Sequence, residues 1–112
     1  MIGNDDWGRD PTVLMMRRIF REMEKAQWAF LSRLGISALD QRLGNWRRPA
    51  RILFEKAWAE ADRMGMSITG ESAGSIYLHC LANRMVRDGV DIPDGTLPND
   101  PEIEKAVRKV IP

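Results

Sequence analysis

Apolar side chains recur at every third or fourth position over a long stretch near the start of this 112-residue chain. From Val13 to Leu34 the spacing persists for about six turns, and it places these side chains on one face of an α-helix. Asp10-Pro11-Thr12 offers a polar cap followed by a proline in the first turn, and Gly35 is typical of a helix end. The pattern predicts a helix over about 11–34. Its apolar face consists of Val13, Met16, Ile19, Phe20, Met23, Ala26, Gln27, Phe30, Leu31 and Leu34.

Two more helices with the same periodicity are predicted downstream. The first begins near residue 46, because Pro49 is tolerated only in a first turn, and it ends at Gly65. The second begins within residues 67–75 and ends at Gly89, and its apolar residues cover so much of its circumference that we expect it to be the most central element. The intervening residues 36–43 are ambiguous and favour only a short helical turn.

The C-terminal part of the chain has a different composition. Three prolines and a glycine fall within residues 90–101, which therefore read as an extended arm, and residues 102–111 read as a short last helix with acids first and bases last. Residues 66–69 are the one candidate strand, and they have no partner strand. We therefore predict a single all-α domain over 1–112: a small three- to four-helix bundle with a flexible N-terminus at 1–9, an extended Pro/Gly-rich C-terminal arm and a short terminal helix.

The composition is that of a folded soluble protein, with 44% apolar and 29% charged residues. Apolar runs do not exceed four residues and no basic, apolar leader opens the chain, so we expect neither a membrane partner nor a secretory signal. Cys80 is the one cysteine, so no intrachain disulfide can form, and we expect a cytoplasmic protein. His79 is the one histidine, and on a helix its side chain diverges from that of Cys80 by about 100°. We therefore expect no metal site and no cofactor.

Charge is distributed unevenly although the formal net charge is only +1. Residues 9–51 carry ten Lys or Arg against four Asp or Glu, whereas residues 91–104 carry five acids and no base. Arginine forks suit phosphate or carboxylate, so nucleic acid is one candidate partner, and a merely solvated basic face is the alternative. The candidate basic patch consists of Arg17, Arg18, Arg21, Arg47, Arg48 and Arg51.

The stretch Gly70-Glu71-Ser72-Ala73-Gly74 resembles the nucleophile elbow of the carboxylesterase and lipase family, which implies Ser72 as a nucleophile between a strand and a helix. His79, however, lies seven residues away on the same predicted helix, about 10 Å along its axis, whereas a nucleophile and its base lie about 3 Å apart. The same letters suit a helix start, with Ser67 or Thr69 as cap and small residues for close packing. We therefore predict a helix entry and no enzyme.

A second local pattern, Ala61 followed by Gly65, resembles the first half of the helix-turn-helix family of DNA-binding domains. The chain departs from that pattern at Glu71 and Gly74, where the family has apolar residues. A degenerate helix-turn-helix over about 57–87 would make the protein a nucleic-acid-binding regulator. Its reading helix would present a polar stripe, which is also the remote candidate for a small-ligand or enzymatic site: Ser72, Ser75, His79 and Asn83.

Large aromatic residues and seven methionines are many for a small helical domain to bury. They favour either a well-filled core or an exposed apolar surface that pairs with another chain, and the arm at 90–101 is a candidate to latch onto a neighbour. The function we favour from the sequence is therefore a non-catalytic interaction or accessory module that binds a protein partner or forms a homo-oligomer. The candidate apolar interface consists of Trp28, Phe30, Trp46 and Trp58.

Overall fold

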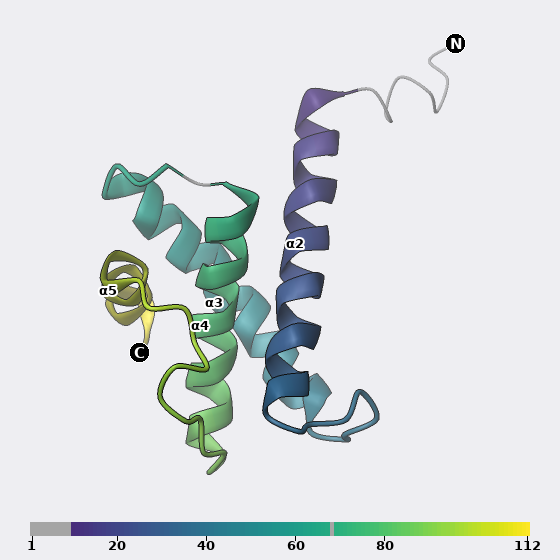
Figure 1. Ribbon diagram of the computed structural model, residues 1–112. Helices are drawn as coiled ribbons and strands as arrows, with labels where there is room; N and C mark the ends of the chain where they lie inside the picture. Colours follow the sequence, from purple (N-terminus) through teal and green to yellow (C-terminus); the bar gives the residue numbers. More distant parts are fainter. Residues whose placement is uncertain (1–9, 68) are drawn as a thin grey trace.

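The structure is a computed structural model that describes residues 10–67 and 69–112. These residues form four helices: α2 (Pro11–Arg33), α3 (Leu43–Arg63), α4 (Gly70–Arg87) and α5 (Pro101–Val110), with no strand in the described ranges (Figure 1). The prediction of an all-α bundle with a short terminal helix is confirmed. The segment predicted to be flexible, 1–9, lies outside the described residues.

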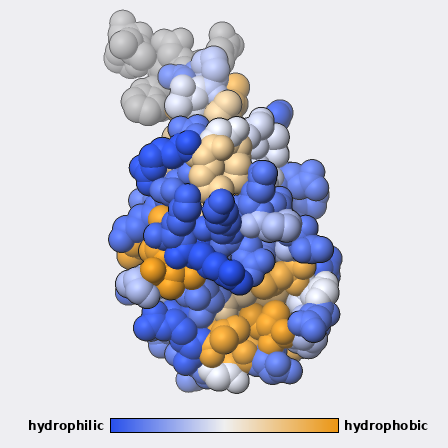
Figure 2. Space-filling model, turned by 90° about the vertical axis from the view of Figure 1, so that its left-hand side faces the viewer, coloured by the Kyte–Doolittle hydropathy of each residue, from blue (hydrophilic) through white to orange (hydrophobic). Residues whose placement is uncertain are grey.

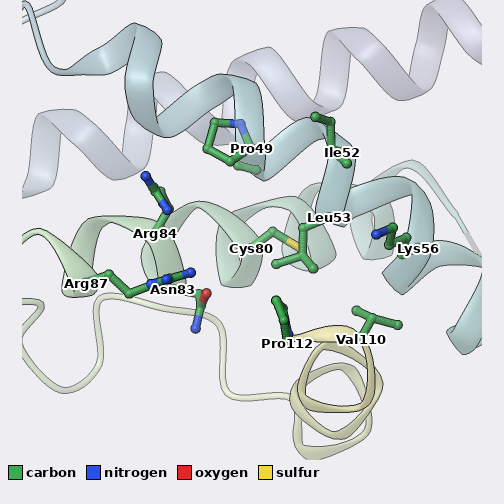
Figure 3. Close-up of a pocket in the computed structure, with 11 residues that line it drawn as sticks. Pro49, Ile52, Leu53, Lys56, Cys80, Asn83, Arg84, Arg87, Val110 and Pro112 are labelled. Atoms are coloured by element: carbon green, nitrogen blue, oxygen red, sulfur yellow. The ribbon is translucent and has the colours of Figure 1, made fainter.

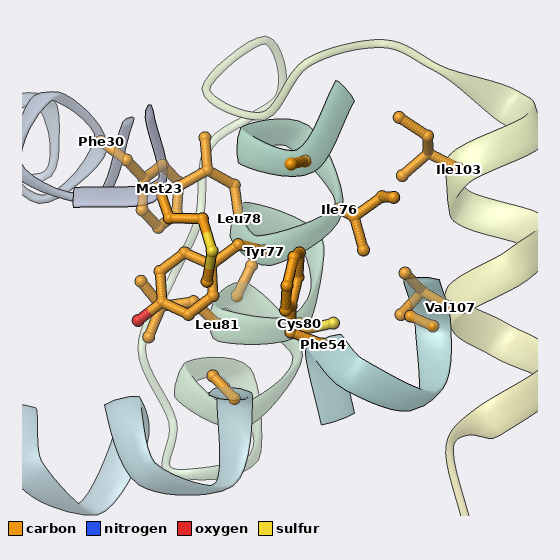
Figure 4. Close-up of a cluster of buried hydrophobic side chains, with 14 of the residues drawn as sticks. Met23, Phe30, Phe54, Ile76, Tyr77, Leu78, Cys80, Leu81, Ile103 and Val107 are labelled. Atoms are coloured by element: carbon orange, nitrogen blue, oxygen red, sulfur yellow. The ribbon is translucent and has the colours of Figure 1, made fainter. Parts of the chain in front are cut away.

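Helix α4 is the centre of the bundle. It packs against α2, α3 and α5, and α3 also packs against α5. Figure 1 shows α2 and α5 on opposite sides of α4. The side chains of α4 dominate the core. Tyr77 of α4 meets Phe54 of α3 edge to face, with ring centroids 6.2 Å apart, and Ile76 and Cys80 of α4 face α5 (Figure 4). The wide apolar coverage of this helix therefore corresponds to contact with three neighbours rather than one.

The helix ends follow the polar residues that flank them. The Asp10 side chain accepts a hydrogen bond from the backbone N–H of Thr12 at 2.8 Å. At the other end, α2 stops at Arg33, and Gly35, with a φ of +71°, turns the chain away. Asp100 accepts from the backbone N–H groups of residues 102 and 103, at 3.2 and 3.3 Å. The predicted starts of α2 and α5 are confirmed within about a residue, because capping is a local interaction.

The start of α3 differs from the prediction. The helix begins at Leu43, so Pro49 lies in its second turn and Gly44 lies within it rather than ending a preceding turn. Proline has no N–H to donate, so the carbonyl of Asn45 loses its usual helical partner. The extra turn forms nevertheless because it buries Leu43 and Trp46, whose burial outweighs the missing hydrogen bond.

The segment between α4 and α5 packs on its own chain. Val90, Ile92 and Leu97 lie against the core, and His79 Nε2 donates to the carbonyl oxygen of Pro98 at 3.0 Å. Residues 90–100 form neither helix nor strand, and a turn joins Pro93 to Thr96. The expectation that this arm latches onto a neighbouring chain stays a prediction. None of the helices in the described ranges has the length and apolar character needed to cross a bilayer.

Candidate functional site

Ser72 is engaged at the start of α4. Its hydroxyl oxygen accepts from the Thr69 backbone N–H at 2.6 Å, and Thr69 Oγ1 accepts from the Ser72 backbone N–H at 3.2 Å. These two bonds form a capping box, in which each side chain satisfies a backbone donor near the helix end. Of the two caps that the sequence offered, Ser67 and Thr69, the structure has Thr69.

The small residues of the same motif serve helix packing. A Cβ added to Gly74 would lie 3.3 Å from Ala26 Cβ, so α2 and α4 approach closely there. Ala73 and Gly74 are both buried. The residues that resemble a nucleophile elbow thus start a helix and let its first turns touch α2.

The other members of the polar stripe do not converge on one site. Ser75 lines a groove between α2 and α4, whereas His79 and Asn83 line a groove beside α5 with Ile92 of the arm. No hydrogen bond joins Ser75 to His79 among the described residues, and His79 is occupied by Pro98. The stripe is therefore divided between grooves. Figure 2 shows the face of the bundle that carries α5, which is mostly hydrophilic with separate apolar areas.

The burial of α4 bears on the helix-turn-helix interpretation. A recognition helix needs a free face along its length to enter a DNA groove. Here α4 is covered by three other helices, and nine of its residues are buried, including Ala73 and Ile76. The burial therefore argues against α4 as a DNA-reading helix.

The basic patch is divided into two sets that differ in what they contact. Arg47 and Arg51 of α3 both reach Glu24 of α2, at 3.0 and 2.9 Å. Arg48 is exposed. The three patch arginines on α2 are also exposed and form no ion pair among the described residues; they are Arg17, Arg18 and Arg21. Only part of the predicted patch is therefore free to bind an anion, because Arg47 and Arg51 tie α3 to α2.

A buried polar network that the sequence analysis missed lies behind these ion pairs. Gln27 is fully buried, and its Oε1 accepts from Arg47 Nε at 3.0 Å and from the Tyr77 hydroxyl at 2.6 Å. Burial raises the pKa of Tyr77 above its ordinary value, which keeps the hydroxyl protonated and able to donate. The signal available in the sequence was one glutamine on an otherwise apolar helix face.

The four candidate interface aromatics occupy different environments. Phe30 and Trp46 belong to the core, and Trp46 Nε1 donates to Asp88 at 2.7 Å. Trp58 is half-buried and meets Phe54 edge to face. Trp28 is 37% exposed, with Arg47 over its ring at 5.5 Å. The aromatics therefore do not form a shared surface, because helix packing turns two of them inward.

The largest exposed apolar surface of α2 lies instead in its N-terminal half, residues 11–21. Figure 1 shows this half of the helix rising past the rest of the bundle. Met16 and Phe20, which the periodicity assigned to the core, are 50% and 46% exposed here. Their neighbours Leu14 and Met15 are 48% and 63% exposed. The reason is that α4 starts at Gly70, beside Glu22 of α2, so no helix in the described ranges covers the preceding turns.

A cavity of about 250 Å³ opens between α3, α4 and the C-terminal end of the chain, where Val110 ends α5 and Pro112 follows. Leu53, Cys80 and Val110 give it an apolar lining, and burial raises the pKa of the Cys80 thiol to about 12, which keeps it uncharged. Figure 3 shows Arg84 beside Pro49 at one side of the cavity and Lys56 at the opposite side. Asn83 is the one residue of the predicted polar stripe that lines this cavity.

Within the described ranges, no group of three or more His, Cys, Asp and Glu side chains is placed to hold a metal ion. Comparisons with protein-family models, with curated proteins and with solved structures found no match to this chain.

Proposed function

We propose that the protein is an interaction module that binds another protein chain through the N-terminal half of α2. The observation that carries this proposal is the continuity of one helix face. Met16, Ile19 and Phe20 continue the line of Met23 and Phe30, which α4 buries, past the point where α4 begins. The same face that builds the core is thus left open over two to three turns.

The open face has the chemistry of a helix that inserts into a groove. Burying each of its large apolar side chains yields about 1.5–3 kcal/mol, and methionines adapt to irregular pockets. Arg17, Arg18 and Arg21 occupy the other sides of these turns and form no ion pair among the described residues. The partner we propose therefore offers an apolar groove with an acidic rim.

Site-specific photo-crosslinking in the native host tests this proposal. A photoreactive residue in place of Met16 is expected to yield a protein adduct, whereas the same residue in place of Leu39, which is more exposed but lies outside α2, yields none. The adduct should map to an apolar groove with acidic flanks and should disappear in Phe20→Asp. Equal adducts from both positions, or no protein adduct from position 16, would contradict the proposal.

Two outcomes identify the partner more closely. Light scattering of the purified protein at physiological salt separates self-association, which gives a defined oligomer that Phe20→Asp dissolves, from binding to a different chain. A lipid adduct at position 16 would instead mean that this face lies on a membrane surface and would overturn the proposal.

Nucleic-acid binding is the competing function, and it rests on Arg17, Arg18 and Arg21, which form no ion pair in the described part of the chain. Anisotropy with labelled duplex DNA across a salt series distinguishes it, because phosphate contacts make affinity fall steeply with salt. A protein-binding module should show no salt-dependent binding to the DNA. Salt-sensitive binding that is lost on reversing the charge of Arg17 and Arg21 would favour nucleic acid.

A further inference from the structure

We infer that the cavity between α3 and α4 is a binding site for a small organic anion with an apolar body, a function beyond the docking surface on α2. The first argument is charge. Three cationic side chains line the cavity, Lys56 from α3 and Arg84 and Arg87 from α4, and none of the side chains that line it is acidic. None of the three forms an ion pair among the described residues, unlike Arg42, Arg47, Arg51, Arg63 and Arg108.

The second argument is the state of Arg84. Its Nε is buried and has no hydrogen-bond partner within the described part of the chain. A guanidinium donor removed from water without an acceptor is destabilising, and such groups are usually satisfied in folded proteins. An anion in the adjoining cavity would supply the counter-charge that this side chain lacks.

The third argument is the lining between the cations. Leu53 and Cys80 lie between the arginine end and the lysine end in Figure 3, and Val110 lies below Lys56 at the lysine end. The buried thiol stays protonated at neutral pH and behaves as an apolar group. A carboxylate or phosphate at the arginine end, joined to a short aliphatic or aromatic body over these side chains, matches the lining.

The size of the cavity restricts the ligand further. Its volume of about 250 Å³ lies just below the range of about 300–1,000 Å³ found for ligand pockets, which favours a compact molecule over a drug-sized one. Both helices that form the walls are held by the core through buried residues such as Ala50 and Leu81. The site is therefore largely formed before a ligand arrives.

The test uses three probes in a two-dimensional NMR titration of the full chain. Octanoate supplies an anion with an apolar tail, octylammonium supplies the same tail with the opposite charge, and inorganic phosphate supplies an anion with no tail. We expect octanoate to shift the amide signals around Leu53, Cys80 and Arg84, and the other two probes to bind at least about tenfold more weakly. Equal binding of octylammonium, or octanoate shifts confined to the other grooves, would overturn the inference.

Variants separate the site from general surface binding. Arg84→Met and Lys56→Met should each weaken octanoate binding, Arg84→Met by about tenfold, the scale of one lost charge-assisted hydrogen bond. Arg18→Met, which removes an exposed arginine of α2, should leave it unchanged. Arg84→Lys retains the charge and should bind with intermediate affinity, provided that its spectrum shows the native fold. Unchanged affinity in both Arg84 variants would rule out the site.

Two sources of such an anion are distinguished by vesicles of phosphatidylglycerol. If the natural ligand is a free small molecule, the protein should bind octanoate in solution, and any co-sedimentation with the vesicles should not depend on Arg84. Co-sedimentation that Arg84→Met abolishes, without octanoate binding, would overturn the free-ligand site.

Discussion

Gln27 is a polar residue on the apolar face of α2, and the fold places it where it joins three helices. It accepts hydrogen bonds from Arg47 of α3 and Tyr77 of α4, while its own Nε2 has no partner among the described residues. A buried network of this kind fixes the relative position of the helices, because any shift leaves an unpaired polar group in a dry interior.

Removing the Tyr77 hydroxyl tests the network. We expect Tyr77→Phe to lower the free energy of unfolding by about 1 kcal/mol, since Gln27 loses one donor. The double variant Tyr77→Phe/Gln27→Leu should be less destabilised than the sum of its two single variants, because it removes both polar groups together. Urea unfolding of the four proteins measures the coupling, and strict additivity would contradict the bond.

Cys80 has a pKa of about 12 in the folded chain, against an ordinary value of 9.0, because burial disfavours the thiolate. Its contribution to stability is complete below pH 9 and declines as the pH rises toward 12, by about 1.4 kcal/mol per pH unit. The difference in unfolding free energy between wild type and Cys80→Ala should therefore shrink over this range and stay constant from pH 6 to 8.

A thiol reagent gives an independent measure of the same burial. Cys80 should label slowly at pH 8 in the folded protein and rapidly in urea. Fast labelling without denaturant would mean that the cavity beside Cys80 admits the reagent.

At the scale of elements, the packing of α4 on α2 depends on the lack of a side chain at Gly74. An added Cβ there would sit 3.3 Å from Ala26 Cβ and 3.6 Å from the backbone oxygen of Glu22. Gly44, by contrast, lies near the start of α3 with nothing within 4 Å of the corresponding position. The two helical glycines thus share the same unfavourable backbone entropy and differ in the space around them.

This contrast predicts opposite effects of the same substitution. Gly44→Ala should raise the free energy of unfolding by roughly 0.5–1 kcal/mol, the usual gain when alanine replaces a helical glycine. Gly74→Ala should lower it by about 1 kcal/mol, because overpacking outweighs that gain. Thermal or urea unfolding measures both variants, and a stabilised Gly74→Ala would show that α2 moves aside at little cost.

At the scale of the whole molecule, the helices differ in how many neighbours cover them, and this difference sets which segments resist local opening. Helix α4 has neighbours on several sides, whereas residues 11–21 of α2 extend past the start of α4 with large apolar side chains exposed. Contacts that bury apolar surface supply most of a helix's stability in a protein, so the two ends of α2 differ in protection from local opening.

Hydrogen exchange should display this gradient directly. Amides from Ile76 to Met85 should exchange only through global unfolding, whereas those from Met15 to Phe20 should exchange by local opening, at least a hundredfold faster, a difference of roughly 3 kcal/mol. Binding of the partner identified by crosslinking should slow the second set, because local opening of this segment releases the partner, and it should slow the first set too, because global unfolding also releases it. Equal protection in both segments of the free protein would contradict the proposed open face.

The sequence alone determined the helices and most of their ends, because periodicity, caps and glycine stops act within a few residues. Helix ends were predictable in this way from two polar caps and two glycines: Asp10, Thr69, Gly35 and Gly89. It also indicated the central place of α4 from its wide apolar coverage. The start of α3 could not be read locally, since the burial of Trp46 overrides the preference of Pro49 for a first turn.

The tertiary structure decided which side chains are available. Met16 and Phe30 share one face of α2, yet α4 covers only the second, because the length of α4 rather than the pattern of α2 sets where burial stops. The polar stripe of α4 and the basic patch were grouped by sequence and then divided by packing, with Arg47 bound to Glu24 and His79 bound to Pro98. The cavity that brings Lys56 to the same site as Arg84 arises from two helices that lie far apart in sequence, and periodicity within one helix carries no information about such a pairing.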